Sequence, residues 1–454
     1  MDRIVDVAGH ARLVLLDPPP SVVQAVARRF DPYPLVPATR TTVEAGAPDV
    51  ILEAVPASAP RPRFVEVLGD TGDGLVTAWD GASLHLLAGA CSCELPRIGE
   101  AGPLRLRYRP DFPVWSILGP VLGPILHGVV RERGGAVVHG SAVEVDGEAV
   151  LLAGWSESGK TEVALALAAG GAPLLSDKWT VLAPGDGTVA STDVGVLPFP
   201  SPLSVRRWVI DALPELRGAL PAVARVQFAG AAAVSPVAAA LRVREHPARG
   251  PVEALLLGAL EGALDLGERA SVPVSRLRRL GLAADAPTRE RRLRAVVLLQ
   301  AKPTDAGTAT DGRGSGPLRS APLRSAPLRS VDRRWAARRL ARSAEAERRT
   351  WIDLLGRMAY AAEQRPVDDA SGGASGGASG DPGRTELWQP AAVRAADEER
   401  LASMLTGIPI VEIAAPFPGD PRRLADAIRQ SLSGMTARGE TEMPVAAGDR
   451  RPRP

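Results

Sequence analysis

The sequence predicts an α/β fold with a phosphate-loop core, a small N-terminal α+β domain and a C-terminal part that linkers divide. The core is predicted because residues 148–169 read as an apolar strand, a glycine-rich loop and an alanine- and leucine-rich helix, the order that a phosphate loop requires. The N-terminal domain is predicted over residues 1–110, where short apolar runs alternate with turn residues around one helical stretch. Two low-complexity segments, 303–331 and 367–386, have too few large apolar residues to pack, so we expect flexible linkers.

The elements of the core, which is expected over residues 111–300, follow from the pattern. After a helix that ends near residue 133, two apolar strands, AVVHGSAVEV and EAVLLAG, flank an Asp-Gly dipeptide that favours a tight turn. The glycine loop comes next and is followed by the helical sequence TEVALALAA. The sequence GAPLLSDKWTVLAP then predicts a further strand, with Asp177 near the carboxyl edge of the sheet, where open α/β sheets bind their ligands.

The C-terminal part is predicted to contain three structured pieces and a tail. Residues 332–366 predict one long helix, because apolar residues from Trp351 to Met358 recur on one face at helical spacing. We interpret its arginines as a solvated face, and a nucleic-acid-binding stripe is the weaker alternative. Residues 387–435 predict a helix, a strand and a helix that complete the core sheet, and residues 436–454 predict a disordered polar tail.

Composition limits the partners of the chain. Its 454 residues suffice for two or three cores, and 54 basic against 52 acidic residues create no general field for nucleic acid. Cys91 and Cys93 lack the further ligands of a zinc site and are interpreted as thiols of a reducing cytoplasm. No signal peptide is recognisable, so a cytoplasmic protein is expected. The apolar segment 112–130 contains three prolines and a histidine, which favours a kinked, packed helix over a membrane span.

The stretch GWSESGKTE matches the phosphate-loop pattern G-x-x-x-x-G-K-[ST] and predicts that ATP and Mg²⁺ are the cofactors. Backbone N–H groups of such a loop bind phosphate oxygens, and the dipole of the following helix assists them. Lys160 is expected to reach the β- and γ-phosphates, and the Thr161 hydroxyl is expected to bind Mg²⁺. The residues predicted to contact the nucleotide are Gly154, Ser156, Glu157, Ser158, Gly159, Lys160, Thr161 and Glu162.

Three neighbouring stretches, VVHGSAVEVDGEAVLLAG, GWSESGKTE and GGAPLLSDKW, resemble the core of the HPr kinase/phosphorylase family and its wider group of HPr-kinase-like proteins. The resemblance covers about residues 133–185. It implies a phosphate-loop kinase fold and transfer of phosphate to a serine of a small carrier protein or, among relatives, of a peptide. It also implies that His139 lies beside the phosphates, that Lys160 and Thr161 bind nucleotide and Mg²⁺, and that Asp177 is the first catalytic, metal-binding aspartate.

The chain departs from this family in two places. The family has paired aspartates after the strand, whereas here Asp177 is followed by Lys178, so one carboxylate is missing. The stretch LPFPSPLSVRRWVIDALPELR does not reproduce the signature that contacts HPr, and HPr is therefore not expected to be the acceptor. The N-terminal domain and the C-terminal part lie outside the resemblance.

The residues themselves support part of this assignment and leave alternatives open. A serine hydroxyl needs a base or an orienting acceptor, and Asp177 is the candidate, with His139 and Lys160 as its catalytic neighbours. The alternatives are that His139 is a core histidine with satisfied hydrogen bonds and that Asp177 is a turn residue at the end of a strand. Trp155 and Trp179 are interpreted as packing residues rather than as platforms for adenine.

Three functions remain after these observations. The favoured hypothesis is an ATP-dependent kinase that acts on a serine-like hydroxyl of a peptide or small protein. The second is a nucleotide-binding scaffold or sensor that transfers nothing, and the third and weakest is a small-molecule kinase. Lys178 favours the scaffold, whereas the combination of His139, Lys160, Thr161 and Asp177 favours catalysis. The sequence leaves open ATP, GTP or pyrophosphate as the donor and whether the chain forms a homo-oligomer.

Overall fold

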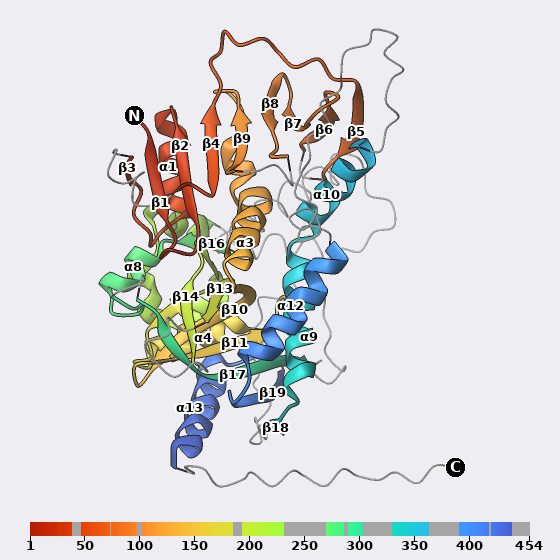
Figure 1. Cartoon of the computed structure of the whole chain (residues 1–454). Helices are drawn as coiled ribbons and strands as arrows, with labels where there is room; N and C mark the ends of the chain where they lie inside the picture. Colours follow the sequence, from red (N-terminus) through yellow and green to blue (C-terminus); the bar gives the residue numbers. More distant parts are fainter. Residues whose placement is uncertain are drawn as a thin grey trace, which may run out of the picture.

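Two large β-sheets, each with helices packed against it, make this chain a mixed α/β protein (Figure 1). The computed structural model describes residues 1–38, 47–72, 74–97, 102–184, 193–230, 269–285, 289–302, 329–362, 390–416 and 419–437. The expected linker 367–386 and most of the expected linker 303–331 and of the tail 436–454 lie outside these residues.

The N-terminal sheet is built from residues 3–108 and, within the described residues, has nine strands in the order β3-β1-β2-β4-β9-β8-β7-β6-β5. Strand β9 buries alternate side chains, whereas β2 and β4 each bury three consecutive residues. Helix α1 packs on the same core through Val22 and Val26. The elements are β1 (Arg3–Asp6), β2 (Arg12–Leu16), α1 (Pro20–Arg29), β3 (Val36–Pro37), β4 (Val50–Ala54), β5 (Glu66–Asp70), β6 (Val76–Trp79), β7 (Leu84–Ala88), β8 (Cys91–Glu94) and β9 (Leu104–Tyr108).

The apolar segment after this sheet joins the two halves of the molecule. It forms a 3₁₀ turn, η1 (Val114–Ser116), a π-helical turn, η2 (Leu118–Leu122), and helix α3 (Gly123–Glu132). Its prolines lack the N–H that a regular helix needs, which accounts for the irregular start. Trp115 is exposed, but most of the segment is buried in a cluster that also includes residues of the N-terminal sheet, Trp179 of the second sheet and Phe199, which follows β14. Among the described residues, no helix is long and apolar enough to cross a membrane.

The second sheet holds the glycine loop. Its strands run in the order β11-β10-β13-β14-β17-β19-β18, β12 pairs with β10, and β17 also pairs with β11, so that part of the sheet closes on itself. Strands β11, β17 and β19 are parallel to one another. The bounds are β10 (Ala136–Val145), β11 (Glu148–Gly154), α4 (Lys160–Ala169), β12 (Leu174–Ser176), β13 (Trp179–Pro184), β14 (Val194–Pro198), β17 (Arg291–Lys302), β18 (Arg329–Ser330) and β19 (Ile410–Pro416).

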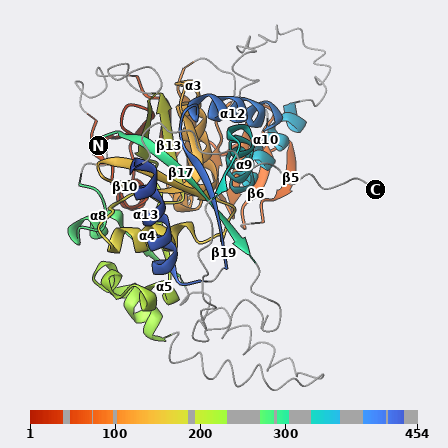
Figure 2. The ribbon, with the colours of Figure 1, turned by 90° about the horizontal axis from the view of Figure 1, so that it is seen from below.

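Helices cover both faces of the second sheet. Alternate residues of β11 face opposite sides: Val150 and Leu152 pack in one apolar cluster with α4 and α13, whereas Leu151 and Ala153 pack in another with α9 and α12. Figure 2 shows α13 beside α4. The remaining elements are β15 (Leu203–Arg206), α5 (Arg207–Ala212), η3 (Pro214–Ala219), β16 (Arg269–Val272), α8 (Val274–Arg279), α9 (Arg333–Glu347), α10 (Arg349–Ala362), α12 (Pro390–Met404) and α13 (Pro421–Ala437).

The C-terminal elements belong to the second sheet. β19 lies beside β17, and α12 and α13 flank it in the sequence on either side. The predicted linker 303–331 is wrong at its C-terminal end, because Arg329 and Ser330 form strand β18 and pair with β19. Backbone pairing at an exposed strand edge needs no apolar pattern, so the sequence carries no signal for this strand.

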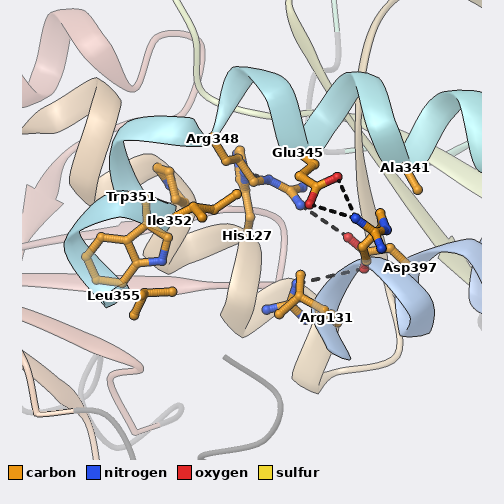
Figure 3. A pocket seen from close by; sticks show the side chains of 12 residues that line it. His127, Arg131, Ala341, Glu345, Arg348, Trp351, Ile352, Leu355 and Asp397 are labelled. Atoms are coloured by element: carbon orange, nitrogen blue, oxygen red, sulfur yellow. Dashed lines mark hydrogen bonds and ion pairs between the residues drawn. The ribbon is translucent and has the colours of Figure 1, made fainter. Parts of the chain in front are cut away.

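The expectation of one long helix over residues 332–366 is wrong. The chain forms two consecutive helices, α9 and α10, and Arg348 lies at the break with a ψ angle of 6°. Figure 3 shows the Arg348 side chain directed toward His127 and Asp397. Its guanidinium is buried and donates to His127 Nδ1 (3.0 Å), Asp397 Oδ2 (3.2 Å) and the Val137 carbonyl (2.7 Å). Arginine is almost never fully buried without a partner, so the sequence alone does not predict this anchor.

We expect Asp397→Ala to lower the free energy of unfolding by about 3 kcal/mol, because it leaves Arg348 and Arg131 buried without their carboxylate. The measurement is chemical denaturation at pH 7. The control is Glu398→Ala, which removes a partly exposed ion pair with Arg394 and should cost less than about 0.5 kcal/mol. Equal losses in the two variants would contradict a structural role for the buried pair.

Candidate functional site

The glycine loop connects β11 to α4 at the carboxyl edge of the parallel strands. Gly154 has a φ of 155°, and a Cβ there would lie 2.7 Å from Ser158 Oγ and closer still to the Leu299 carbonyl of β17. Gly159 has a φ of 89° and immediately precedes α4. Both positions therefore require glycine, Gly154 because of the close approach of β17 and Gly159 because of its left-handed backbone.

The loop presents hydrogen-bond donors at the start of a helix. The first N–H groups of α4 have no acceptors within the helix, and they lie at its positive end. The Ser158 hydroxyl is buried and has no hydrogen-bond partner among the described residues. Ser156 is exposed on the same loop, and Glu157 turns outward to pair with Arg206 (2.6 Å) and Arg269 (3.0 Å). Such an arrangement of donors suits an anion.

Lys160 lies inside the loop. Its side chain is buried, and Nζ donates to the carbonyls of Trp155 (2.6 Å) and Gly154 (3.2 Å). Burial lowers the pKa of Lys160 to about 8, while the charge of Asp177 acts in the opposite direction. Phosphate oxygens would be stronger acceptors for this ammonium group than the two neutral carbonyls, because both partners would then be charged.

Thr161 and Asp177 meet beneath the loop. Asp177 Oδ1 accepts hydrogen bonds from Ser141 Oγ (2.6 Å) and Thr161 Oγ1 (2.8 Å), and the Lys178 backbone N–H also donates to this carboxylate. Burial raises the pKa of Asp177, and these hydrogen bonds lower it. A threonine hydroxyl beside a buried carboxylate is the protein contribution to Mg²⁺ in phosphate-loop enzymes, where phosphates complete the coordination.

His139 contacts the loop through a residue that sequence reasoning missed. Its Nδ1 lies 2.9 Å from Ser343 Oγ, and Ser343 donates to the Gly154 carbonyl at 3.1 Å. Because the Ser343 proton is used for that bond, Ser343 accepts from His139, which places the imidazole proton on Nδ1 and a lone pair on Nε2. Burial, and then the charges of Lys160 and Lys178, lower the pKa of His139 to about 3. The imidazole is therefore neutral at physiological pH.

Ser343 follows His139 by 204 residues in the sequence. Its position could have been suspected from one signal: it is a polar residue on the face of α9 that buries Ala336, Leu340 and Ala344. A buried hydroxyl on an apolar helix face needs a partner, and Ser343 finds two.

Lys178 and Glu162 border the site. Lys178 adopts a left-handed backbone conformation, with a φ of 64°, in the turn between β12 and β13. Its side chain is about half exposed, and Nζ lies 3.9 Å from Oε2 of Glu347, the last residue of α9. Glu162 is in the first turn of α4, and burial raises its pKa.

Trp155 and Trp179, the two tryptophans near the site, differ in their exposure to solvent. Trp179 is buried and packs against His127 and His139, as expected. The interpretation of Trp155 as a packing residue is wrong, because its side chain is 56% exposed in the part of the chain that the structure describes. Trp155 borders a hollow of about 220 Å³ at the carboxyl edge of the sheet. The other residues that line this hollow are Gly154, Leu298, Leu299, Arg339, Leu340, Arg342 and Glu412.

The chain matches no model of a known protein family and no curated protein. The chemistry of this site is therefore inferred from its own residues. The site combines a glycine loop at the start of a helix, a buried lysine and a hydroxyl–carboxylate pair, which come from β10, β11, α4 and the end of β12.

Acidification is expected to weaken the fold through His139. Its pKa is about 3 in the folded chain, whereas an unperturbed histidine titrates near 6.5, so the unfolded chain binds more protons between these two values. The free energy of unfolding should fall as the pH drops below about 6.5, with a loss of about 2 kcal/mol at pH 5.

The measurement is denaturation of the wild-type chain and of His139→Gln at pH 7 and pH 5. The variant keeps a neutral polar side chain and should lose about 2 kcal/mol less between the two pH values. The same pH dependence in both chains would refute the assignment of a neutral, buried imidazole.

Proposed function

We propose that this chain is an HPr-kinase-like phosphate-loop kinase, which binds MgATP at the loop and transfers the γ-phosphoryl group to a hydroxyl of a peptide or small protein. The observation that carries the proposal is the hydrogen bond between Thr161 and Asp177 directly below a loop that buries Lys160. A structural role alone would not require a buried lysine, a buried carboxylate and a glycine-lined helix start at one edge of a sheet.

The Thr161 hydroxyl and the Asp177 carboxylate are the groups that would hold Mg²⁺. The ion would supply charge neutralisation at the phosphates, and Asp177 is suited to it because burial and two hydroxyl donors fix the orientation of its carboxylate. Lys160 would place its ammonium charge on the β- and γ-phosphates, and the N–H groups at the start of α4 would bind the remaining oxygens.

In the proposed reaction, the acceptor hydroxyl oxygen forms a bond to the γ-phosphorus while the bond from phosphorus to the β–γ bridging oxygen breaks. ADP leaves with the electron pair of that bond, and the hydroxyl proton passes to a carboxylate of the protein. The resemblance of residues 133–185 to HPr-kinase-like proteins favours a serine as the acceptor. The hollow beside Trp155 is lined by two arginines, Arg339 and Arg342, and by one carboxylate, Glu412, and this excess of positive charge favours an anionic ligand there.

The second candidate function is a nucleotide-binding scaffold, and Lys178 is the observation that favours it. A lysine stands where HPr kinases have a second aspartate, and its side chain points toward Glu347. The two functions separate in one assay, in which the chain is saturated with γ-labelled MgATP and offered a random library of serine-containing peptides. Transfer of label supports the kinase, and binding without transfer supports the scaffold. GTP and pyrophosphate in the same assay would identify the donor.

We expect Lys160→Ala to weaken MgATP binding at least about tenfold, or about 1.4 kcal/mol, because it removes the buried charge that faces the phosphates. Calorimetry measures this affinity. Arg429→Ala is the matched control, since Arg429 donates to the Leu167 carbonyl near the opposite end of α4. The control should bind like the wild-type chain. Unchanged affinity in Lys160→Ala would exclude phosphate binding by this loop.

A further inference from the structure

The last two turns of α9 present one face to the glycine loop. Ser343 and Glu347 are four residues apart on this helix and therefore share a face. Ser343 contacts both the Gly154 carbonyl and His139, which fixes this face against the loop. Glu347 is the next residue on the face, one turn closer to Lys178.

The Glu347 carboxylate has oxygen atoms available for a ligand. Its side chain is 22% exposed. Among the described residues its ion pair is with Lys178, at 3.9 Å, which is too long for a hydrogen bond. Lys178 follows Asp177 directly, so this contact holds Glu347 beside the end of β12. A second observation also places Glu347 near the loop. Its negative charge raises the pKa of Lys160, and among the nearby carboxylates only Asp177 has a larger effect.

Asp177 is less accessible to an acceptor than Glu347. Asp177 is buried, and Ser141, Thr161 and the Lys178 N–H already donate to its carboxylate. A hydroxyl on a peptide or protein must reach its base from the solvent side, which the partly exposed Glu347 allows.

We propose that Glu347, the last residue of helix α9, is the second carboxylate of the site and the one that receives the acceptor. This inference rests on the proposed kinase function and assigns a residue to one of its steps. Glu347 accepts the hydrogen bond of the acceptor hydroxyl and takes its proton as the new oxygen–phosphorus bond forms, and ADP leaves with the electrons of the broken bond. Asp177 then serves Mg²⁺, and Lys178 positions the Glu347 carboxylate.

The test compares Glu347→Gln with the wild-type chain and with Glu345→Gln. Glu345 pairs with Arg394 and lines the pocket around Asp397 (Figure 3). It is two residues from Glu347 on the same helix and therefore lies on a different face. With γ-labelled MgATP and a random library of serine-containing peptides, the turnover number of Glu347→Gln should fall by about 100-fold or more, and that of Glu345→Gln should stay within about twofold. Glu347→Asp should restore part of the loss, and all variants should retain the melting temperature of the wild-type chain.

Two results would overturn the proposal: wild-type turnover in Glu347→Gln, or equal losses in Glu347→Gln and Glu345→Gln. A wild-type chain that binds MgATP but labels no peptide would instead refute the kinase function.

A second measurement tests the position of Glu347 independently of phosphate transfer. Because Glu347→Gln removes a negative charge near the expected position of the γ-phosphate, calorimetry should find that the variant prefers MgATP over MgADP about threefold more than the wild-type chain does. An unchanged preference would show that Glu347 does not face the phosphates.

Discussion

The Ser343 hydroxyl connects helix α9 to the glycine loop, and the geometry of the site depends on it. It donates to the carbonyl of Gly154, where β11 ends, and accepts from His139 on β10. A single buried hydroxyl thus fixes the entry to the loop, the tautomer of the imidazole and the position of the helix. Because a buried polar group without partners is costly, the three segments stabilise one another only when all are in place.

Arg348 extends this connection away from the loop. It follows the last residue of α9, and its guanidinium joins β10, α3 and α12 through Val137, His127 and Asp397. The break between α9 and α10 therefore occurs where a buried ion pair fixes the end of α9, with Glu347 held next to it in the sequence. An ion pair of this kind contributes little net stability compared with apolar packing, but removal of one partner is costly because the other charge stays buried.

The sequence predicts the centre of the site better than its surroundings. Strands β10 and β11, the turn at Asp146 and Gly147, and helix α4 follow from hydrophobic pattern and turn chemistry, and they lie where the pattern places them. The sequence also predicts that one site contains Lys160, Thr161 and Asp177, because the loop motif and the strand that follows it are close together in the sequence. The role of Glu347 and the closure of β17 onto β11 could not be predicted, because they depend on contacts between residues more than a hundred positions apart. For Ser343 the sequence offers one signal, its place on the apolar face of α9, but not its partners. Trp155 was misjudged because an aromatic residue in a loop carries no periodicity that separates packing from exposure.

Electrostatic interactions connect the glycine loop with helix α9. Burial disfavours the charged forms of both Lys160 and Asp177, lowering the pKa of the lysine and raising that of the aspartate, so each charge depends on a nearby group of opposite sign. Part of the negative charge that acts on Lys160 comes from Glu347. This residue follows the loop by more than 180 residues, and a long segment outside the described residues lies between them. A truncated chain that ends before α9 would keep the complete loop motif but would lose the hydroxyl that holds Gly154 and the carboxylate beside Lys178. The candidate site is therefore formed by the glycine loop together with helix α9, and the loop motif alone lacks the contacts that Ser343 and Glu347 contribute.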